Sequence, residues 1–206
     1  MKHKLIFIAL LLVLSSLYSK AQLVTRKDYD LAIAVQAGLN MSIAIPDNNG
    51  IAFQPAYGLK LTIPFTRKYF LGSEINYVEH RYNNKQGEDK VALKYRKQDL
   101  SIPVYFKYML NSNTNSLLLG GYFSYAIERK FLSASGSEKK QINTWDAGII
   151  AGFEQNITRN LYVTFKVSAG IKELLKKEQF DKKYYPLQVG LTVGYTFVRF
   201  GDCGCH

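Results

Sequence analysis

The feature that most constrains this chain is a strict alternation of apolar and polar residues, repeated along most of its length. From Leu161 to Lys172 the odd positions are all apolar, and the even positions are mostly polar or small. The same pattern runs from Leu187 to Phe197. A helix returns to one face every three to four residues, whereas a strand returns every second residue. The alternation therefore predicts strands with two chemically different faces.

Eight alternating segments follow one another, and each has about the 9–11 residues that a tilted strand needs to cross a bilayer. Their expected bounds are 31–41, 53–65, 69–77, 100–108, 117–127, 145–153, 161–172 and 187–197. Short turns are expected at 66–68, 109–116 and 156–160, and longer polar loops at Pro46, Asn83, Ser133 and Lys176. Short turns at one end and long loops at the other are typical of outer-membrane barrels. The pattern predicts an all-β fold, an eight-stranded antiparallel up-and-down transmembrane β-barrel.

Residues 1–21 have the three parts of a secretory signal peptide. Lys2 and Lys4 precede the apolar run LIFIALLLVL, and small residues precede the expected cleavage site before Gln22. The alternative is an uncleaved anchor, but the apolar run is too short to span a bilayer as a helix. Removing the three lysines of this segment lowers the formal charge from +11 to +8. The expected division is a signal peptide at 1–21, a barrel at 22–200 and a short tail at 201–206.

A soluble barrel of the lipocalin type would alternate in the same way with its faces exchanged, apolar inside and polar outside. Glycines on the polar face favour the membrane alternative, because small residues suit a crowded interior. Aromatic residues make up 14% of the chain and gather near the strand ends on the apolar face, as in interfacial girdles. The expected girdle residues are Phe65, Tyr69, Tyr108, Phe153, Tyr195 and Phe197 at the short-turn end, and Phe53, Tyr77, Tyr125 and Trp145 at the loop end.

Several motifs resemble those of the small PorT-like outer-membrane barrels of Bacteroidetes-type bacteria. They are KAQ at Lys20, GLNMS at Gly38, DLSIPVYFKY at Asp99, GGYFSY at Gly120, DAGIIAGFE at Asp146 and VGYTF at Val193. The resemblance covers the mature chain and implies an eight-stranded barrel in the outer membrane, without implying one activity. The family's namesake is associated with a secretion system, and nothing in this chain ties it to that role. The residues VRFGDCGCH after Phe197 depart from the usual aromatic end of such barrels.

Nine charged residues are expected on the inward face of the barrel. They are Lys60, Glu74, Asp99, Lys107, Glu128, Asp146, Glu154, Lys166 and Lys172. They could line a conduit, or they could pair with one another and fill an interior too narrow for a channel. The second interpretation is favoured, because eight strands leave little free space and Tyr105, Tyr122 and Tyr162 add bulk.

Evidence for chemistry in the sequence is weak. Cys203, Cys205 and His206 are soft-metal ligands, but they lie on a free end, and a closed metal site needs four scaffolded ligands. His80 is expected at the loop-side rim, and no serine at a matching spacing suggests a nucleophile. We therefore expect no enzyme activity and no cofactor.

The expected location is the outer membrane of a Gram-negative bacterium, with both termini in the periplasm. Basic residues are scattered over turns and loops, so no nucleic-acid partner is expected. Loop lysines such as Lys176, Lys177, Lys182 and Lys183 would meet lipopolysaccharide, and the long loops could bind a protein. The leading hypothesis is a structural or loop-mediated interaction role. The alternatives are a narrow pore or a transport- or secretion-associated component, and a soluble secreted ligand-binding barrel.

Overall fold

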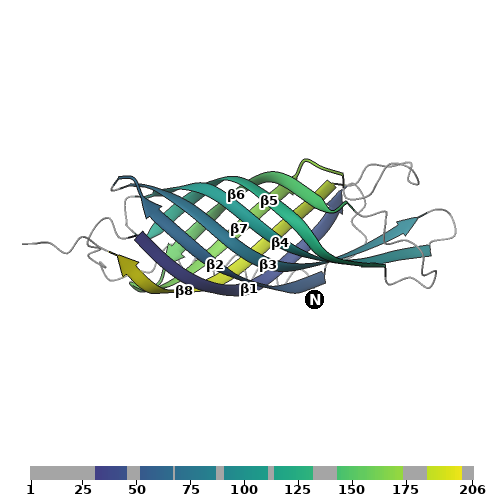
Figure 1. Ribbon diagram of the computed structural model, residues 1–206, viewed down its shortest axis with the longest axis horizontal. Coiled ribbons are helices and arrows are strands. Elements are labelled where there is room, and N and C mark those ends of the chain that lie inside the picture. The colour runs from purple at the N-terminus through teal and green to yellow at the C-terminus, as the bar shows by residue number, and fades with distance from the viewer. Residues whose placement is uncertain are drawn as a thin grey trace, which may run out of the picture.

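The computed structural model describes residues 31–45, 52–66, 68–86, 91–110, 114–131, 143–173 and 185–200. Each strand pairs antiparallel with the next, and β8 pairs with β1, so the sheet closes into a barrel (Figure 1). The strands are β1 Leu31–Ile45, β2 Ala52–Pro64, β3 Tyr69–Gln86, β4 Val91–Met109, β5 Asn115–Phe131, β6 Trp145–Asn156, β7 Leu161–Gly170 and β8 Tyr185–Phe200. The predicted fold class and the eight predicted strands are confirmed. None of the described segments forms a helix with the length and hydropathy needed to span a bilayer.

The tight turns at one end of the barrel use a threonine in the same way. In the turn between β2 and β3, the backbone N–H of Phe65 donates to Tyr69 O at 2.9 Å, and Thr66 Oγ1 accepts from Tyr69 N at 3.1 Å. In the turn between β6 and β7, Ile157 N donates to Leu161 O at 2.8 Å, and the Thr158 hydroxyl accepts from Leu161 N at 3.0 Å. A threonine hydroxyl that satisfies a backbone N–H in this way stabilises a short reversal of the chain.

At the other end, β3 and β4 continue past the rest of the barrel. Their ladder runs to the pair Gln86↔Val91, whereas the ladder between β2 and β3 ends at Ala56↔Val78. Figure 1 shows this hairpin projecting beyond its neighbours. The sequence predicted a polar loop from Asn83, and that prediction is wrong for 83–86, which belong to β3. The segment lacks apolar alternation because it lies outside the barrel wall, where neither face needs to be apolar.

The two faces of the barrel wall have the polarity of a membrane protein. The outer face exposes large apolar side chains along every strand, such as Leu119 at 67% and Phe106 at 64%. Rings gather at both ends of this face, where Tyr69 lies 5.1 Å from Tyr108 and Phe123 lies 6.2 Å from Trp145, measured between centroids. A soluble barrel would bury these side chains, so the lipocalin-type alternative is not supported.

A β-bulge changes the face assignment near the loop end of β5. The register between β4 and β5 shifts between Gln98 and Asp99, so that Asp99 pairs with Ala126 while Gln98 pairs with Glu128. Ala126 is buried in the interior, but Glu128 lies beside the outward-facing Gln98. The prediction that Glu128 faces the interior is therefore wrong. Simple alternation fails there because the bulge at Ile127 inserts one extra residue.

Candidate functional site

The most densely charged part of the interior is centred on Glu154 of β6. Its carboxylate accepts from the ammonium groups of Lys60 of β2 and Lys107 of β4. Thr164 Oγ1 of β7 donates to the same carboxylate at 3.1 Å. All four residues are buried. One acid thus joins strands that lie on different sides of the barrel.

Glu74 of β3 forms the second centre. Its Oε2 accepts from Lys166 Nζ at 2.5 Å and from Gln36 Nε2 at 2.7 Å, and its Oε1 accepts from the Tyr105 hydroxyl at 2.6 Å. Asn76 Nδ2 donates to Oε2 at 2.7 Å. Buried charges are tolerated when they are paired and hydrogen-bonded in this way.

Together, Lys60, Glu74, Lys107, Glu154 and Lys166 form a single layer that we call the ionic seal. Two tyrosine rings close the space around it. Lys60 Nζ lies 4.4 Å from the centroid of Tyr162 and 5.9 Å from that of Tyr105. These rings lie directly over glycines of neighbouring strands, since a Cβ at Gly72 would collide with Tyr105 and one at Gly194 with Tyr162. The glycines are therefore required by the packing of the interior.

A separate cluster lies nearer the loop end of the interior. Asp99 Oδ2 accepts from Lys97 Nζ and from the Ser124 hydroxyl, both at 2.7 Å. The Tyr122 hydroxyl donates to Asp146 Oδ2 at 2.7 Å. The ionic seal holds three lysines against two glutamates, whereas this cluster holds one lysine against two aspartates. The described interior is thus more basic at the short-turn end and more acidic at the loop end.

His80 belongs to this second cluster, and its predicted position as a solvated rim residue is wrong. The residue is 1% exposed, its Nδ1 lies 2.7 Å from Ser42 Oγ, and its Nε2 lies 3.8 Å from Asp99 Oδ2. A serine, a histidine and an acid thus meet, although their sequence spacing gave no sign of it. The histidine–aspartate distance exceeds a hydrogen bond, and all three residues are buried. The arrangement is a hydrogen-bonded packing cluster.

The structure places the nine predicted interior charges in different environments. Lys60, Glu74, Lys107, Glu154 and Lys166 meet in the ionic seal, and Asp99 and Asp146 lie in the second cluster. Lys172 does not face the interior, because it follows the end of β7 and its ammonium lies 3.1 Å from the centroid of the outward-facing Trp145 ring. Glu128 lies on the outer face, as described above. Sequence reasoning missed Lys97, His80 and Gln36, although Gln36 lies on the polar face of a recognised strand.

The weak candidates for metal binding, Cys203, Cys205 and His206, lie outside the described residues. Among the side chains that the structure describes, no group of three or more histidine, cysteine, aspartate or glutamate residues could hold a metal ion.

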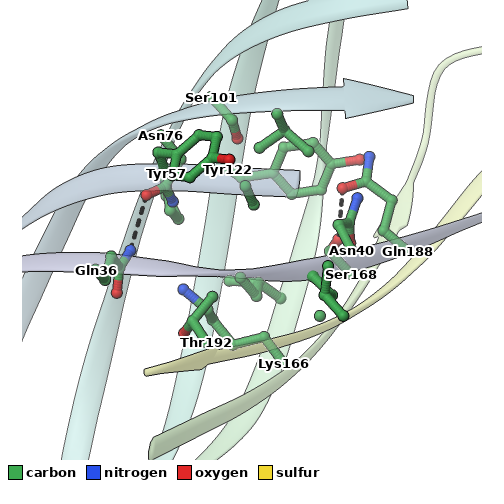
Figure 2. Close-up of a pocket in the computed structure, with 16 residues that line it drawn as sticks. Gln36, Asn40, Tyr57, Asn76, Ser101, Tyr122, Lys166, Ser168, Gln188 and Thr192 are labelled. Atoms are coloured by element: carbon green, nitrogen blue, oxygen red, sulfur yellow. Dashed lines mark hydrogen bonds between the residues drawn. The ribbon is translucent and has the colours of Figure 1, made fainter. Parts of the chain in front are cut away.

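Two cavities lie on opposite sides of the ionic seal. The larger has a volume of about 60 Å³ and is bordered by Gln36, Asn40, Tyr122, Lys166 and Thr192, among others (Figure 2). The smaller, of about 10 Å³, lies at the short-turn side, where Lys60, Lys107 and Glu154 border it. The side chains of the ionic seal lie between the two spaces.

Comparisons with known proteins agree with this architecture. The family model described as outer membrane protein beta-barrel domain matches residues 20–176. No curated protein matches the chain. Among solved structures, Neisserial surface protein A is 14% identical with a TM-score of 0.56, over 80% of this chain and 97% of that one.

Two further solved structures are similar at lower TM-scores. Ail of Yersinia pestis, in complex with the heparin analogue sucrose octasulfate, is 15% identical with a TM-score of 0.49, over 84% of this chain and 99% of that one. OprG from Pseudomonas aeruginosa is 10% identical with a TM-score of 0.49, over 82% and 97%. The family match covers most of the chain, and the apolar outer face fits it. The chain therefore belongs to the outer membrane protein β-barrel domain family and is an integral outer-membrane β-barrel protein.

Proposed function

We propose that this protein is a sealed barrel that acts through what it presents at the cell surface, without transport or catalysis. The observation that carries the proposal is the extension of β3 and β4 beyond the barrel, with a ladder that continues to Gln86↔Val91. A regular hairpin of this kind is a rigid platform, because its backbone groups are paired with each other. Such a platform suits contact with a protein or with a neighbouring surface.

The ionic seal supports the absence of transport. Five charged side chains from β2, β3, β4, β6 and β7 fill the interior at one level, and Tyr105 and Tyr162 close the gaps between them. In planar bilayers, the purified monomer is expected to give no sustained conductance. Steady, ion-selective channels in the wild type would contradict the proposal and favour the narrow-pore alternative.

The proposed orientation places both termini in the periplasm and the β3–β4 hairpin outside the cell. Two observations support it. The pair Leu31↔Phe200 lies at the barrel end where β2 turns tightly into β3, and outer-membrane barrels keep their short turns on the periplasmic side. The proposal includes removal of residues 1–21 as a signal peptide and a short periplasmic tail at 201–206.

Lipopolysaccharide is the proposed lipid partner at the loop end. Glu79 and Arg81 share the outer face of β3 with Tyr77, and Arg96 pairs with Arg81 in register. Arg81 Nε and Arg96 Nη2 hold the Glu79 carboxylate at 2.7 and 2.5 Å, and the arginine side chains remain partly exposed. Guanidinium groups just above an aromatic girdle lie at the level of anionic headgroups, whose oxygens they bind well.

The proposal also includes the narrower affiliation with the PorT-like barrels of Bacteroidetes-type bacteria. The motifs DLSIPVYFKY at Asp99 and DAGIIAGFE at Asp146 support it. Both motifs supply interior residues of the second cluster, namely Asp99 and Asp146.

Site-specific photo-cross-linking in living cells tests the surface role. A photoreactive residue at Glu88, between β3 and β4, is compared with one at Lys68, in a tight turn at the opposite end. We expect a discrete adduct from Glu88 with an extracellular or surface protein, and not from Lys68. Adducts that are the same from both positions, or none from Glu88, would contradict the proposal.

The orientation is tested by labelling intact cells with a membrane-impermeant maleimide. The native Cys203 and Cys205 are expected to react only after the outer membrane is permeabilised. Glu88→Cys, in a background where both native cysteines are serine, should react in intact cells. Labelling of the native cysteines in intact cells would reverse the proposed orientation.

A further inference from the structure

The larger interior cavity has features that the seal does not explain. It lies on the loop-end side of the layer formed by Glu74 and Lys166, and the stem of Lys166 forms part of its wall (Figure 2). Polar groups from β1, β7 and β8 border it, among them Asn40, Ser168 and Gln188. Apolar groups such as Val78 and Ile150 complete the wall.

Two polar atoms in this wall have no hydrogen-bond partner in the structure. They are Gln36 Oε1 and Thr192 Oγ1, and their residues are 5% and 6% exposed. Gln36 uses its amide nitrogen to reach Glu74 and Asn76, which turns its carbonyl oxygen away from both. A buried polar atom without a partner costs roughly 1–3 kcal/mol, so buried polar atoms are almost always satisfied by protein or by ordered water.

The surroundings of Gly190 in β8 show that the cavity contains unfilled space. A Cβ added there would come no closer than 3.5 Å to Asn40 Oδ1, an ordinary van der Waals contact. Gly194, four residues along the same strand, has no such room, because a Cβ there would collide with the Tyr162 ring. The glycine at 190 is therefore not required by close packing and leaves a gap opposite Lys166, its register partner.

We propose that this cavity is an internal hydration site that holds a small cluster of ordered water molecules. Its volume of about 60 Å³ fits a few waters, since each needs about 10–15 Å³ of such space and two to four polar partners. Gln36 Oε1 supplies an acceptor, the Thr192 hydroxyl supplies a donor, and the Lys166 ammonium has three donors of which one reaches Glu74 at 2.5 Å. The cavity is smaller than the roughly 150 Å³ that takes up benzene, which excludes larger organic ligands.

The water cluster supplies hydrogen-bond partners to Gln36 Oε1 and Thr192 Oγ1, which the neighbouring side chains leave without partners. The barrel interior then has two parts that are stabilised in different ways. The ionic seal is closed by direct ion pairs, whereas the layer on its loop-end side, which Lys166 also borders, depends on solvent as a structural component.

Two isosteric substitutions at Gly190 distinguish a wet cavity from a dry one. Gly190→Thr and Gly190→Val add side chains of the same branched shape, and only the threonine hydroxyl can replace a displaced water. We expect the equilibrium constant for unfolding, measured in urea with detergent micelles, to be at least tenfold larger for the valine variant than for the threonine variant. Equal stability, or a more stable valine variant, would overturn the proposal, because a dry cavity gains from either methyl group.

Direct detection of bound water in the wild-type protein tests the proposal even if both variants at position 190 fail to fold. In the wild-type protein in micelles, NMR cross-peaks between water and the side-chain amide of Gln36 or the backbone amide of Gly190 are expected, with the long residence of buried water. In Gly190→Val these cross-peaks should disappear, while those of exposed turn residues such as Thr158 stay. Absence of the cross-peaks in the wild type would overturn the proposal.

Discussion

The two ends of the barrel differ in what an interruption of the apolar–polar alternation does to the charged residues. At the short-turn end, the register of β1 and β8 shifts between Ile33 and Ala34, yet the charged residues stay in the interior and meet partners on distant strands, as Glu154 meets Lys60 and Lys107. At the loop end, a bulge at Ile127 moves Glu128 to the outer face, and β3 and β4 leave the barrel wall. The difference shows that alternation describes a strand for as long as both of its faces are constrained by packing or by lipid.

The largest expected loss of unfolding free energy is for a substitution in the interior at the short-turn end. Glu154→Ala leaves Lys60 and Lys107 buried without the acid that both contact, and removing one partner of a buried ion pair costs about 3–5 kcal/mol. We expect that loss in the free energy of unfolding, measured in urea by Trp145 fluorescence, together with a leak in planar bilayers. Glu154→Gln, which keeps the shape and removes the charge, separates packing from electrostatics. A loss below about 1 kcal/mol would mean that the seal does not depend on this charge.

The second comparison is between two positions on the outer face, one in the central part of a strand and one near the loop end. Phe165, in the central part of β7, is 44% exposed on the apolar face, and Phe165→Arg should cost about 2–4 kcal/mol because it places a charge in the lipid core. Ile127→Arg, at the bulge near the loop end, should cost about 0–1 kcal/mol, as expected near an interface. Refolding into lipid vesicles, followed by heat-modifiable gel mobility, measures both. Equal losses would show that Ile127 lies as deep in the bilayer as Phe165.

Close packing around the seal gives a third, smaller effect. Gly194→Ala forces the Tyr162 ring away from the position in which it faces Lys60, and overpacking of this kind costs about 1–3 kcal/mol. Gly190→Ala is the matched control on the same strand and face, and it should be neutral or slightly stabilising. The same urea titration measures the unfolding free energy of both variants. A larger loss for Gly190→Ala than for Gly194→Ala would contradict the prediction.

The smallest expected effect lies at the loop end. Glu128→Ala removes a carboxylate at the outer rim, where solvent screens charges and exposed pairs contribute about 0–1 kcal/mol. The measured change in unfolding free energy should therefore be far smaller than for Glu154→Ala. A change as large as that of Glu154→Ala would place Glu128 in the interior network after all.

The sequence predicted the barrel well because its main signal is local. Alternation depends on neighbouring residues, and it correctly assigned the inward face of Lys60, Glu74 and Glu154. The ion-pair partners could not be predicted, since Lys60 and Glu154 are 94 residues apart and meet only through closure of the sheet. Glu128 and Lys172 were misplaced because a bulge and a strand end interrupt the alternation.

The second cluster was hidden for the same reason. Ser42, His80 and Asp99 come from β1, β3 and β4, and their meeting depends on the stagger of the strands, which alternation does not determine. The hydration site depends on the absence of a side chain at Gly190. The sequence alone does not show whether a neighbouring side chain fills the space beside a glycine.

The ion pairs of Glu154 also constrain the order of assembly. Lys60 and Lys107 come from β2 and β4, and both must reach across the interior to β6. An open sheet entering the bilayer would carry these charges without partners in a medium of low dielectric constant, at a cost of several kcal/mol for each. Partly closed sheets should therefore be sparsely populated, so that strand closure, burial of charge and membrane insertion proceed as one concerted step.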